Sequence, residues 1–210
     1  MPRNVVFDIG NVLLRWDMRA LYAKLIDDPA RLDWFLREVC SLRRHGPLDA
    51  GATYAEAIAA LIGRHPAEAA LIEAYDARWQ ETITGAIPDV VALLQGLRAA
   101  GVPTYAITNF PAQKWDETCA LYPFLQGFEG VIVSGREGVT KPGAAIFRLL
   151  LERYGLAARD CVFIDDMPAN VEAARALGFH ALRFTDSATL RTGLAELGLR
   201  WAVADPSAAR

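Results

Sequence analysis

Six side chains able to bind or transfer an anionic group stand at or just after short apolar runs of this 210-residue chain. They are three carboxylates, a lysine, a hydroxyl and an amide: Asp8, Asp165, Asp166, Lys141, Thr108 and Asn109. Three crowded carboxylates repel one another unless a cation lies between them, and oxygen ligands without a neighbouring His or Cys cluster favour Mg²⁺. A cation, a lysine and hydrogen-bond donors around one carboxylate suit a phosphoryl group. The residue types therefore predict phosphoryl chemistry with Asp8 as the nucleophile.

Parallel strands are the elements predicted to bring these side chains together. Short, β-branched apolar runs are typical of buried strands, and five occur: Asn4–Phe7, Val102–Thr108, Gly130–Ser134, Cys161–Asp165 and His180–Phe184. From residue 86 onward, helical patterns alternate with these runs, which predicts an α/β fold with a doubly wound parallel sheet. Ligands bind such sheets at the carboxyl ends of the strands. We therefore expect the six side chains to meet at one edge.

Residues 16–85 interrupt that alternation. They contain no convincing strand, but two apolar stripes at helical spacing, one over residues 55–62 and one over residues 71–79. We therefore predict an all-helical cap at 16–85, inserted into a catalytic core made of residues 1–15 and 86–210. The cap aromatics are expected mostly to form the core of the cap: Trp16, Trp34, Phe35, Tyr54, Tyr75 and Trp79. Arg43 and Arg44 could reach a substrate anion, although a solvated helix end is the favoured interpretation.

Composition and charge narrow the class of protein. The hydrophobic share of 53% excludes global disorder, and the net charge of −3 gives no basic surface for nucleic acid. No apolar run approaches the roughly 18 residues that span a bilayer, so no membrane partner is expected. The early apolar stretch is interrupted by Asp8 and Asn11 and fails as a signal peptide. Three distant, unpaired cysteines favour a reducing compartment. A cytoplasmic enzyme is predicted.

Each candidate site has an ordinary structural explanation when it is taken alone. Asp8 could end a strand and begin a turn. The Asp165-Asp166 pair could cap the following helix, and the Thr108-Asn109 pair could be a strand-to-helix cap. Lys141 precedes a predicted helix start, where the helix dipole does not favour a cation. Their joint occurrence at predicted strand ends favours a functional site.

Four short segments carry a resemblance to a known family: Phe7-Asp8-Ile9-Gly10-Asn11-Val12, Ile107-Thr108-Asn109, Lys141-Pro142 and Phe163-Ile164-Asp165-Asp166. In this order they resemble the four motifs of the haloacid dehalogenase-like (HAD) hydrolases. The resemblance extends to about residue 185, and residues 16–85 resemble the family's helical cap, which closes over the active site. Segments 7–14 and 165–170 look most like the branch that holds sugar-phosphate phosphatases and the phosphatase domain of soluble epoxide hydrolases.

For the phosphate, the resemblance implies that Asp8 attacks phosphorus and forms an aspartyl-phosphate. Thr108 and Lys141 would hold the phosphate, with Asn109 beside them. Three residues close to these motifs are candidates for substrate binding: Asn11, Trp16 and Trp115. The partner expected is a small phosphorylated metabolite, a sugar phosphate being one candidate, and the chain is expected to act as a monomer or homodimer.

For the metal, the resemblance implies that Asp8, the backbone carbonyl of Gly10, and Asp166 bind Mg²⁺. Asp165 would act on the ion directly or through water, and Asn170 would support this loop.

Gly10 departs from the common pattern of the family. Most phosphatases of the family carry a second Asp two residues after the nucleophile, as acid for the leaving alcohol and base for the water. General acid–base catalysis is typically worth about 10²–10⁴-fold, so turnover of poor leaving groups is put in question. Asp17 or a residue of the cap could substitute, but spacing does not identify it.

Three functions remain open on these residues. The leading one is a Mg²⁺-dependent phosphatase acting on a small phosphomonoester. The second is a metal-free 2-haloacid dehalogenase, whose relatives also lack the second Asp, although Asp165 and Asp166 have no use in that chemistry. The third is a weakly active member that binds a phosphorylated ligand, and Gly10 is its support.

Overall fold

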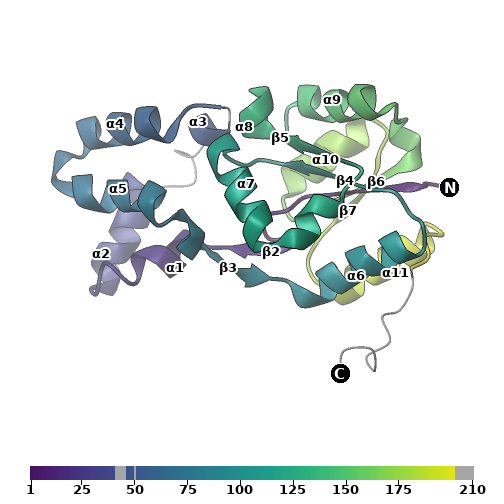
Figure 1. The fold of residues 1–210 in the computed structure, drawn as a ribbon, viewed down its shortest axis with the longest axis horizontal. Helices are drawn as coiled ribbons and strands as arrows, with labels where there is room; N and C mark the ends of the chain where they lie inside the picture. Colours follow the sequence, from purple (N-terminus) through teal and green to yellow (C-terminus); the bar gives the residue numbers. More distant parts are fainter. Residues whose placement is uncertain (41–45, 50, 202–210) are drawn as a thin grey trace.

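A five-stranded parallel sheet forms the centre of the molecule in the computed structural model, which describes residues 1–40, 46–49 and 51–201 (Figure 1). Its strand order is β5-β4-β1-β6-β7. The bounds are Asn4–Phe7 (β1), Thr104–Thr108 (β4), Gly130–Val133 (β5), Cys161–Asp165 (β6) and His180–Arg183 (β7). All five predicted strands are confirmed, and so is the doubly wound α/β fold.

Helices cover both faces of this sheet. Alternate residues of a strand point to opposite faces, so Val5 and Phe7 belong to one apolar cluster and Val6 to another. The first cluster includes residues of α6 (Pro88–Ala99) and α11 (Ser187–Glu196), and the second includes residues of α9 (Ala144–Tyr154) and α10 (Pro168–Ala176). Figure 1 shows these two helix pairs on opposite sides of the sheet. The sheet is therefore buried on both faces, as its apolar runs predict.

Helix ends in this core follow the sequence signals. Pro168 lies at the start of α10, where its missing N–H costs nothing. Gly155 ends α9 in the left-handed conformation at φ 64°, which favours glycine. Two shorter helices, α7 (Ala112–Leu121) and α8 (Ser134–Glu137), follow β4 and β5.

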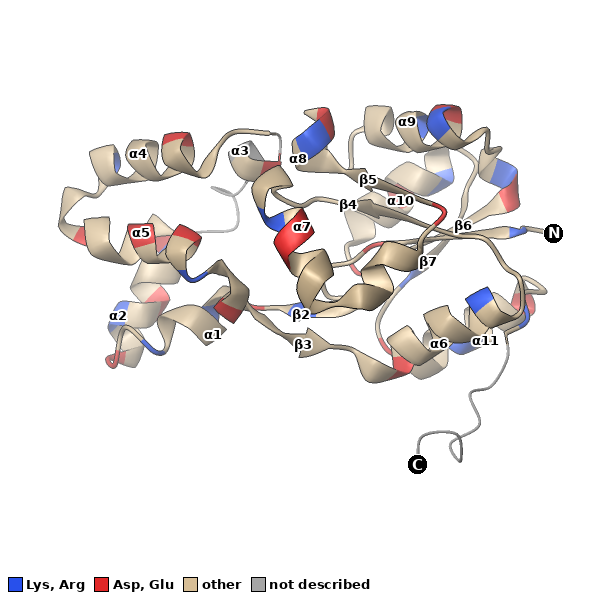
Figure 2. Ribbon diagram, in the orientation of Figure 1, with Lys and Arg blue, Asp and Glu red and all other residues tan. Residues whose placement is uncertain are grey.

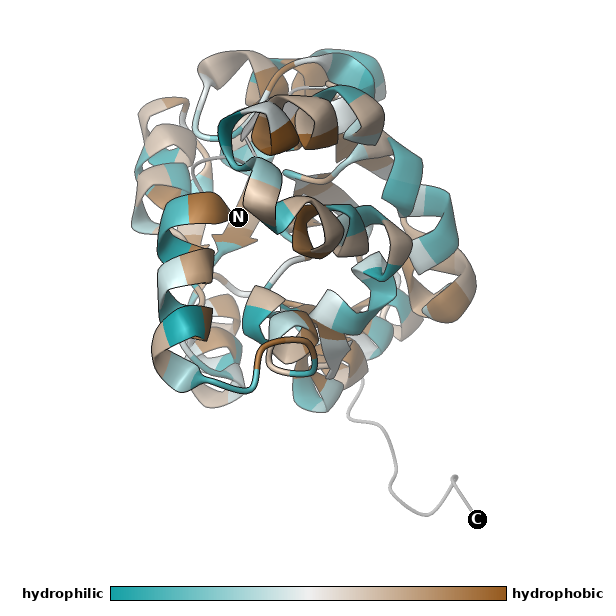
Figure 3. Cartoon of the chain, turned by 90° about the vertical axis from the view of Figure 1, so that its left-hand side faces the viewer, coloured by the Kyte–Doolittle hydropathy of each residue, from teal (hydrophilic) through white to brown (hydrophobic). Residues whose placement is uncertain are grey.

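The segment between β1 and α6 forms a second group of helices at the far end of the molecule from the N-terminus (Figure 1). Its α-helices are Met18–Tyr22 (α1), Pro29–Trp34 (α2), Gly46–Asp49 (α3), Tyr54–Arg64 (α4) and Ala69–Ala77 (α5). In the same segment a π-helix spans Phe35–Val39, and short 3₁₀ helices span Pro66–Glu68 and Trp79–Thr82. Two further 3₁₀ helices lie in the core, at Pro123–Gly127 and Ala158–Asp160. Figure 3, viewed from this end, shows hydrophobic and hydrophilic residues alternating along these helices. The domain boundaries at residues 15 and 85 stay a prediction.

One expectation for this segment is wrong, because it contains a strand. Residues Ile83–Ala86 form β3, which pairs antiparallel with β2 (Leu14–Trp16). The sequence Ile-Thr-Gly-Ala shows no apolar alternation, and Gly85 has a φ of 131°. The strand is therefore stabilised by its pairing with β2 rather than by local propensity. The pair joins the two ends of the inserted segment and places Trp16 opposite Ile83.

Charges lie mainly on the outer helices, with both signs interspersed (Figure 2). Among the described residues, no helix is both long and apolar enough to cross a membrane. Arg43 and Arg44 lie outside the described residues, so the solvated helix end and the alternative contact with substrate both stay untested.

Candidate active site

Asp8 follows β1, the middle strand of the sheet, and its side chain is buried, with the residue 7% exposed. The backbone N–H of Ile9 donates a hydrogen bond of 2.7 Å to Asp8 Oδ1. Because β1 lies between β4 and β6, Asp8 lies between the ends of the strands that carry Thr108 and Asp165. The chain order of the sheet thus brings together residues that are far apart in sequence.

Lys141 connects two of these carboxylates. Its Nζ lies 2.8 Å from Asp8 Oδ1 and 2.6 Å from Asp165 Oδ2, and the side chain is almost completely buried. Burial opposes the charge of Lys141, but Asp8 and Asp165 together raise its pKa. The lysine is therefore held as a cation at the end of β1.

Asn109 positions Lys141 through its backbone. Asn109 Oδ1 accepts a hydrogen bond of 2.8 Å from the Lys141 N–H, and its Nδ2 donates one of 3.0 Å to the Lys141 carbonyl. A side-chain amide that satisfies both backbone groups of one residue holds that residue in a single place.

Asp165, at the end of β6, is fully buried and surrounded by donors. Asn170 Nδ2 lies 2.9 and 3.0 Å from its two oxygens, and the Met167 N–H donates to Oδ1 at 2.9 Å. Lys141 Nζ donates to the other oxygen. Because protein donors already contact both oxygens, Asp165 holds Lys141 and the loop after β6 in place.

Asp8, Asp165 and Asp166 form a cluster of carboxylates that could hold a metal ion, with one oxygen of each within 4.8 Å of the others. Burial, followed by the charges of Asp165 and Asp166, raises the pKa of Asp8 to about 7, although Lys141 acts in the opposite direction. Burial and Asp165 also raise the pKa of Asp166. One lysine does not balance three carboxylates, and this set of hard oxygen donors fits Mg²⁺.

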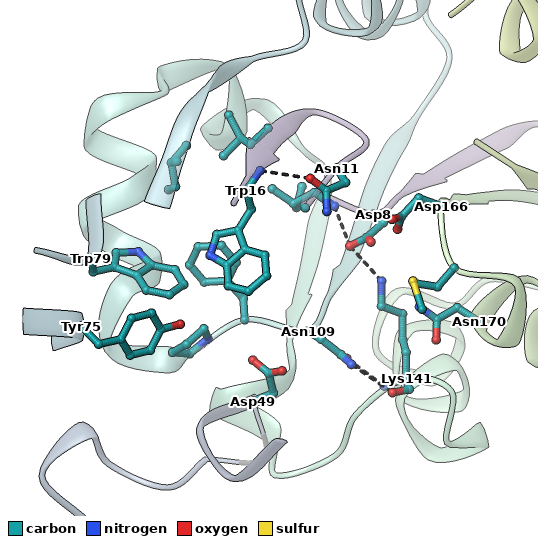
Figure 4. Close-up of a pocket in the computed structure, with 17 residues that line it drawn as sticks. Asp8, Asn11, Trp16, Asp49, Tyr75, Trp79, Asn109, Lys141, Asp166 and Asn170 are labelled. Carbon is teal, nitrogen blue, oxygen red and sulfur yellow. Dashed lines mark hydrogen bonds and ion pairs between the residues drawn. The ribbon is translucent and has the colours of Figure 1, made fainter. Parts of the chain in front are cut away.

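A cavity of about 310 Å³ opens from these groups toward the cap (Figure 4). One end is polar and is lined by Asp8, Gly10, Asn109, Lys141 and Asp166. The other end is aromatic. Its wall includes Trp16, Tyr75, Trp79, Ile83 and Phe110.

Ring contacts join this aromatic wall. The ring centroids of Trp79 lie 6.4 Å from Trp16, 5.4 Å from Tyr75 and 5.7 Å from Phe110. Aromatic pairs at such separations add to the stabilisation from burial. Trp79 therefore links residues of the cap to Phe110, which follows β4 in the core.

The structure places the three predicted substrate-binding residues differently. Asn11 and Trp16 line the cavity, and the backbone N–H of Trp16 donates to Asn11 Oδ1 at 3.1 Å. Asn11 has a φ of 55°, a conformation that Asn tolerates better than most residues. Trp115 is only 5% exposed and packs against Phe110 with ring centroids 5.5 Å apart. Phe110 lines the cavity and Trp115 does not, so the ring of Trp115 packs on the side of Phe110 away from the cavity.

Thr108 ends β4 beside Asp8 in the sheet order, and it is buried and does not line the cavity. Its predicted contact with phosphate therefore stays a prediction. Gly10 lines the cavity, and a Cβ added there would have no neighbour within 4 Å. Glycine at this position leaves open space where most relatives are expected to carry a carboxylate.

Sequence reasoning missed several residues of the site, above all Asp49 at the end of α3. No motif surrounds Asp49, and its contact with the cavity depends on how the cap packs on the core. Phe110 and Met167 also line the cavity. Each directly follows a predicted motif, and this position next to the motif could have marked both as lining residues.

A model of the haloacid dehalogenase-like hydrolases matches residues 2–178 of the chain. A sesquiterpene phosphatase from Aspergillus oryzae is 33% identical over 98 residues, which cover 47% of this chain and 50% of that protein. Hexitol phosphatase A from Escherichia coli is 31% identical over 118 residues, 55% of this chain and 53% of that protein. The chain thus spans about half the length of these relatives.

The fold is also similar to a solved structure. A HAD family enzyme from Bacteroides thetaiotaomicron, in complex with magnesium and inorganic phosphate, has a TM-score of 0.70 and 21% identity, over 88% of this chain and 95% of that one. At this identity the likeness concerns the fold alone.

Proposed function

The chain belongs to the haloacid dehalogenase-like hydrolases, and from this premise we propose that it is a Mg²⁺-dependent phosphatase of small phosphomonoesters. The observation that carries the proposal is the group of Asp8, Lys141, Asp165 and Asp166 at the polar end of the cavity. A buried carboxylate beside a fixed cation and further carboxylates is suited to attack a phosphate whose charge a metal ion shares.

In this mechanism an oxygen of Asp8 attacks phosphorus, the bond from phosphorus to the ester oxygen breaks, and an aspartyl-phosphate forms. Lys141 neutralises part of the charge on the phosphoryl oxygens, and Asn109 and Asp165 keep it in position. Asp8, Asp166 and the Gly10 carbonyl would hold Mg²⁺, which withdraws charge from the phosphate when bound. Water then attacks the aspartyl-phosphate and releases inorganic phosphate.

The organic group of the ester is proposed to be apolar. Trp16, Tyr75, Trp79 and Phe110 line the end of the cavity where this group would lie. A sugar would lose hydrogen bonds to water against such a wall, whereas an apolar alcohol gains by leaving water. The relative from Aspergillus oryzae is a sesquiterpene phosphatase, and sesquiterpenes are apolar, which supports this choice. A cavity of about 310 Å³ accommodates a small ester.

The metal-free dehalogenase and the weakly active phospholigand-binding protein are the competing functions. Two carboxylates, Asp165 and Asp166, would repel an anionic haloacid beside Asp8. The weakly active alternative is favoured by Gly10 alone.

The test is hydrolysis of p-nitrophenyl phosphate with Mg²⁺. We expect activity that EDTA removes and Mg²⁺ restores, and that Asp8→Asn abolishes. Asp28→Asn is the matched control, because Asp28 caps α2 and Asn caps helices equally well. Activity that survives both EDTA and Asp8→Asn would contradict the mechanism. Halide release from a 2-haloacid without metal would favour the dehalogenase instead.

A further inference from the structure

Gly10 leaves the proposed phosphatase without the usual proton carrier next to its nucleophile. Departure of an alcohol needs a proton at the ester oxygen, and attack by water needs a base. Open space surrounds Gly10, so another side chain has room to serve the ester oxygen. The carrier must lie where the polar and aromatic ends of the cavity meet, because the ester oxygen joins phosphate to organic group.

Asp49 lies at that junction. It is the last residue of α3, and it lines the same cavity as Asp8 and Lys141. In Figure 4 its carboxylate projects into the cavity between Tyr75 on one side and Asn109 on the other. Among the lining residues that the structure describes, Asp49 is the carboxylate contributed by the cap.

The electrostatic environment of Asp49 agrees with this position. Its carboxylate interacts with the charge of Lys141 at the polar end, and its own charge acts on Tyr54 and Tyr75 at the aromatic end. Within the described ranges of the chain, no side chain donates a hydrogen bond to Asp49 and no cation pairs with it. Its carboxylate is therefore available to a ligand.

We propose that Asp49 is the general acid and base of this enzyme and replaces the carboxylate that Gly10 lacks. The inference rests on the proposed phosphatase function. In the first step Asp8 bonds to phosphorus, the ester oxygen takes the electron pair of the broken bond, and Asp49 gives that oxygen its proton. In the second step Asp49 takes a proton from the attacking water, and the bond from phosphorus to Asp8 breaks. The products are the alcohol and inorganic phosphate, and Asp49 is protonated again.

The acidity of Asp49 suits both steps. Burial raises its pKa to about 6, with Lys141 acting in the opposite direction. A carboxyl group with a pKa near neutrality can donate a proton in one step and accept one in the next.

The charged side chains of the elements packed against α3 are already paired with other residues. In α8, Arg136 pairs with Asp116, and Glu137 pairs with Arg153. In α4, Glu56 accepts hydrogen bonds from Thr53, and Arg64 at the far end of the helix donates one to the Ala60 carbonyl. Lys141, Asp8 and Asp166 face Asp49 across the cavity. Among the residues that the structure describes, Lys141 is therefore the cation whose charge acts on it.

The test compares Asp49→Asn with the wild type on two esters of similar size. p-Nitrophenyl phosphate has a good leaving group, whereas benzyl phosphate has a poor one that needs protonation. We expect kcat/KM for benzyl phosphate to fall about 10²-fold, and for p-nitrophenyl phosphate to fall far less. The kcat for p-nitrophenyl phosphate should also fall, because hydrolysis of the aspartyl-phosphate loses its base. Phosphorylated protein should then accumulate.

Gly10→Asp provides a rescue experiment. In the Asp49→Asn background it should restore part of the activity on benzyl phosphate, because a carboxylate returns beside the nucleophile. Asp28→Asn is again the matched control, and it should leave the ratio of kcat/KM for the two esters unchanged. An equal loss of kcat/KM on both esters in Asp49→Asn, or no loss at all, would overturn the role of Asp49. If the wild type hydrolyses neither ester, the phosphatase proposal itself fails before any Asp49 variant is measured.

Discussion

The two ends of the cavity are built in different ways. At the polar end, the ends of β1 and β6 and the loop after α8 hold Asp8, Asp165 and Lys141 through ion pairs and hydrogen bonds of 2.6 to 3.0 Å. At the aromatic end, Trp16 and Trp79 come from the inserted segment and its border, and ring contacts hold them. Hydrogen bonds are directional and apolar contacts are not. The geometry of the polar end is thus suited to one reaction. At the aromatic end, substitution of a wall residue can change which organic group binds.

The largest expected effect comes from Lys141→Ala, which would break the polar end. It leaves Asp8 and Asp165 buried without their cation, which costs about 3–5 kcal/mol of the free energy of unfolding. Transition-state charge also loses its fixed partner, so kcat/KM should fall about 10²–10³-fold. Urea unfolding and hydrolysis of p-nitrophenyl phosphate measure the two effects.

Lys24→Ala is the control for this change, because Lys24 pairs with Glu81 at the surface. Exposed ion pairs contribute about 0–1 kcal/mol. If Lys141→Ala were no more harmful than Lys24→Ala, the polar end would not depend on its cation.

Asn170→Ala should give the next largest effect, and it concerns metal affinity. Asn170 donates to both oxygens of Asp165, next to Asp166. Losing such a supporting hydrogen bond typically costs 10–100-fold in metal affinity. The Mg²⁺ concentration for half-maximal activity should rise by that amount, while saturating Mg²⁺ restores most of kcat. Asn4→Ala, at the start of β1 and away from the site, should leave the Mg²⁺ dependence as it is.

Trp16→Ala would sharpen the contrast from the other side. It removes an aromatic wall residue but no polar group, so KM for benzyl phosphate should rise about 10-fold, or about 1.4 kcal/mol. Inhibition by inorganic phosphate, which contacts the polar end alone, should change little. Trp34 is a tryptophan of the same segment that does not line the cavity, and Trp34→Ala is the control. A matching loss of phosphate inhibition in Trp16→Ala would mean that the two ends are not separable.

The polar end was the predictable part of the site. Parallel strands that are buried on both faces leave a clear apolar signal, and the residue after each strand lies at a known edge of the sheet. Asp8 and Asp165 could therefore be brought together from sequence alone, as could the five strands of the sheet. Lys141 was expected near them a short loop after the third strand, and the structure has α8 within that connection. Asn109 was predicted beside the phosphate, but its hold on the backbone of Lys141 depends on loop geometry that no spacing encodes.

The aromatic end was much less predictable. Tyr75 and Trp79 carry the spacing of a helix core, and nothing in a helical stripe tells which of its members also faces a cavity. Trp115 has an equally good signal, yet the turn of α7 places it behind Phe110. The strand Ile83–Ala86 exists because β2 lies beside it. Asp49 stands in no motif, and its placement follows from the docking of the cap on the core.

The smallest expected effect is on stability, and it separates a catalytic Asp49 from a structural one. Because the pKa of Asp49 is raised from 3.8 to about 6 in the folded protein, the folded state holds this proton more strongly than the unfolded state. Stability attributable to this proton is present at low pH and is lost as the pH rises from about 4 through 6. At pH 8 the buried charge is a full cost, and Asp49→Asn removes it.

We therefore expect Asp49→Asn to be more stable than the wild type at pH 8 by roughly 1 kcal/mol. The difference is this small because Asp49 is only half-buried and solvent reduces the cost of its charge. The difference should shrink at pH 5, where more of the wild-type carboxyl group is protonated. Urea unfolding at the two pH values measures it, with Asp17→Asn as the exposed control. A loss of stability at pH 8 would instead mean that the Asp49 carboxylate supports the fold. A variant that gains stability while it loses activity on benzyl phosphate would show that the cap carries a charge for catalysis at a cost to folding.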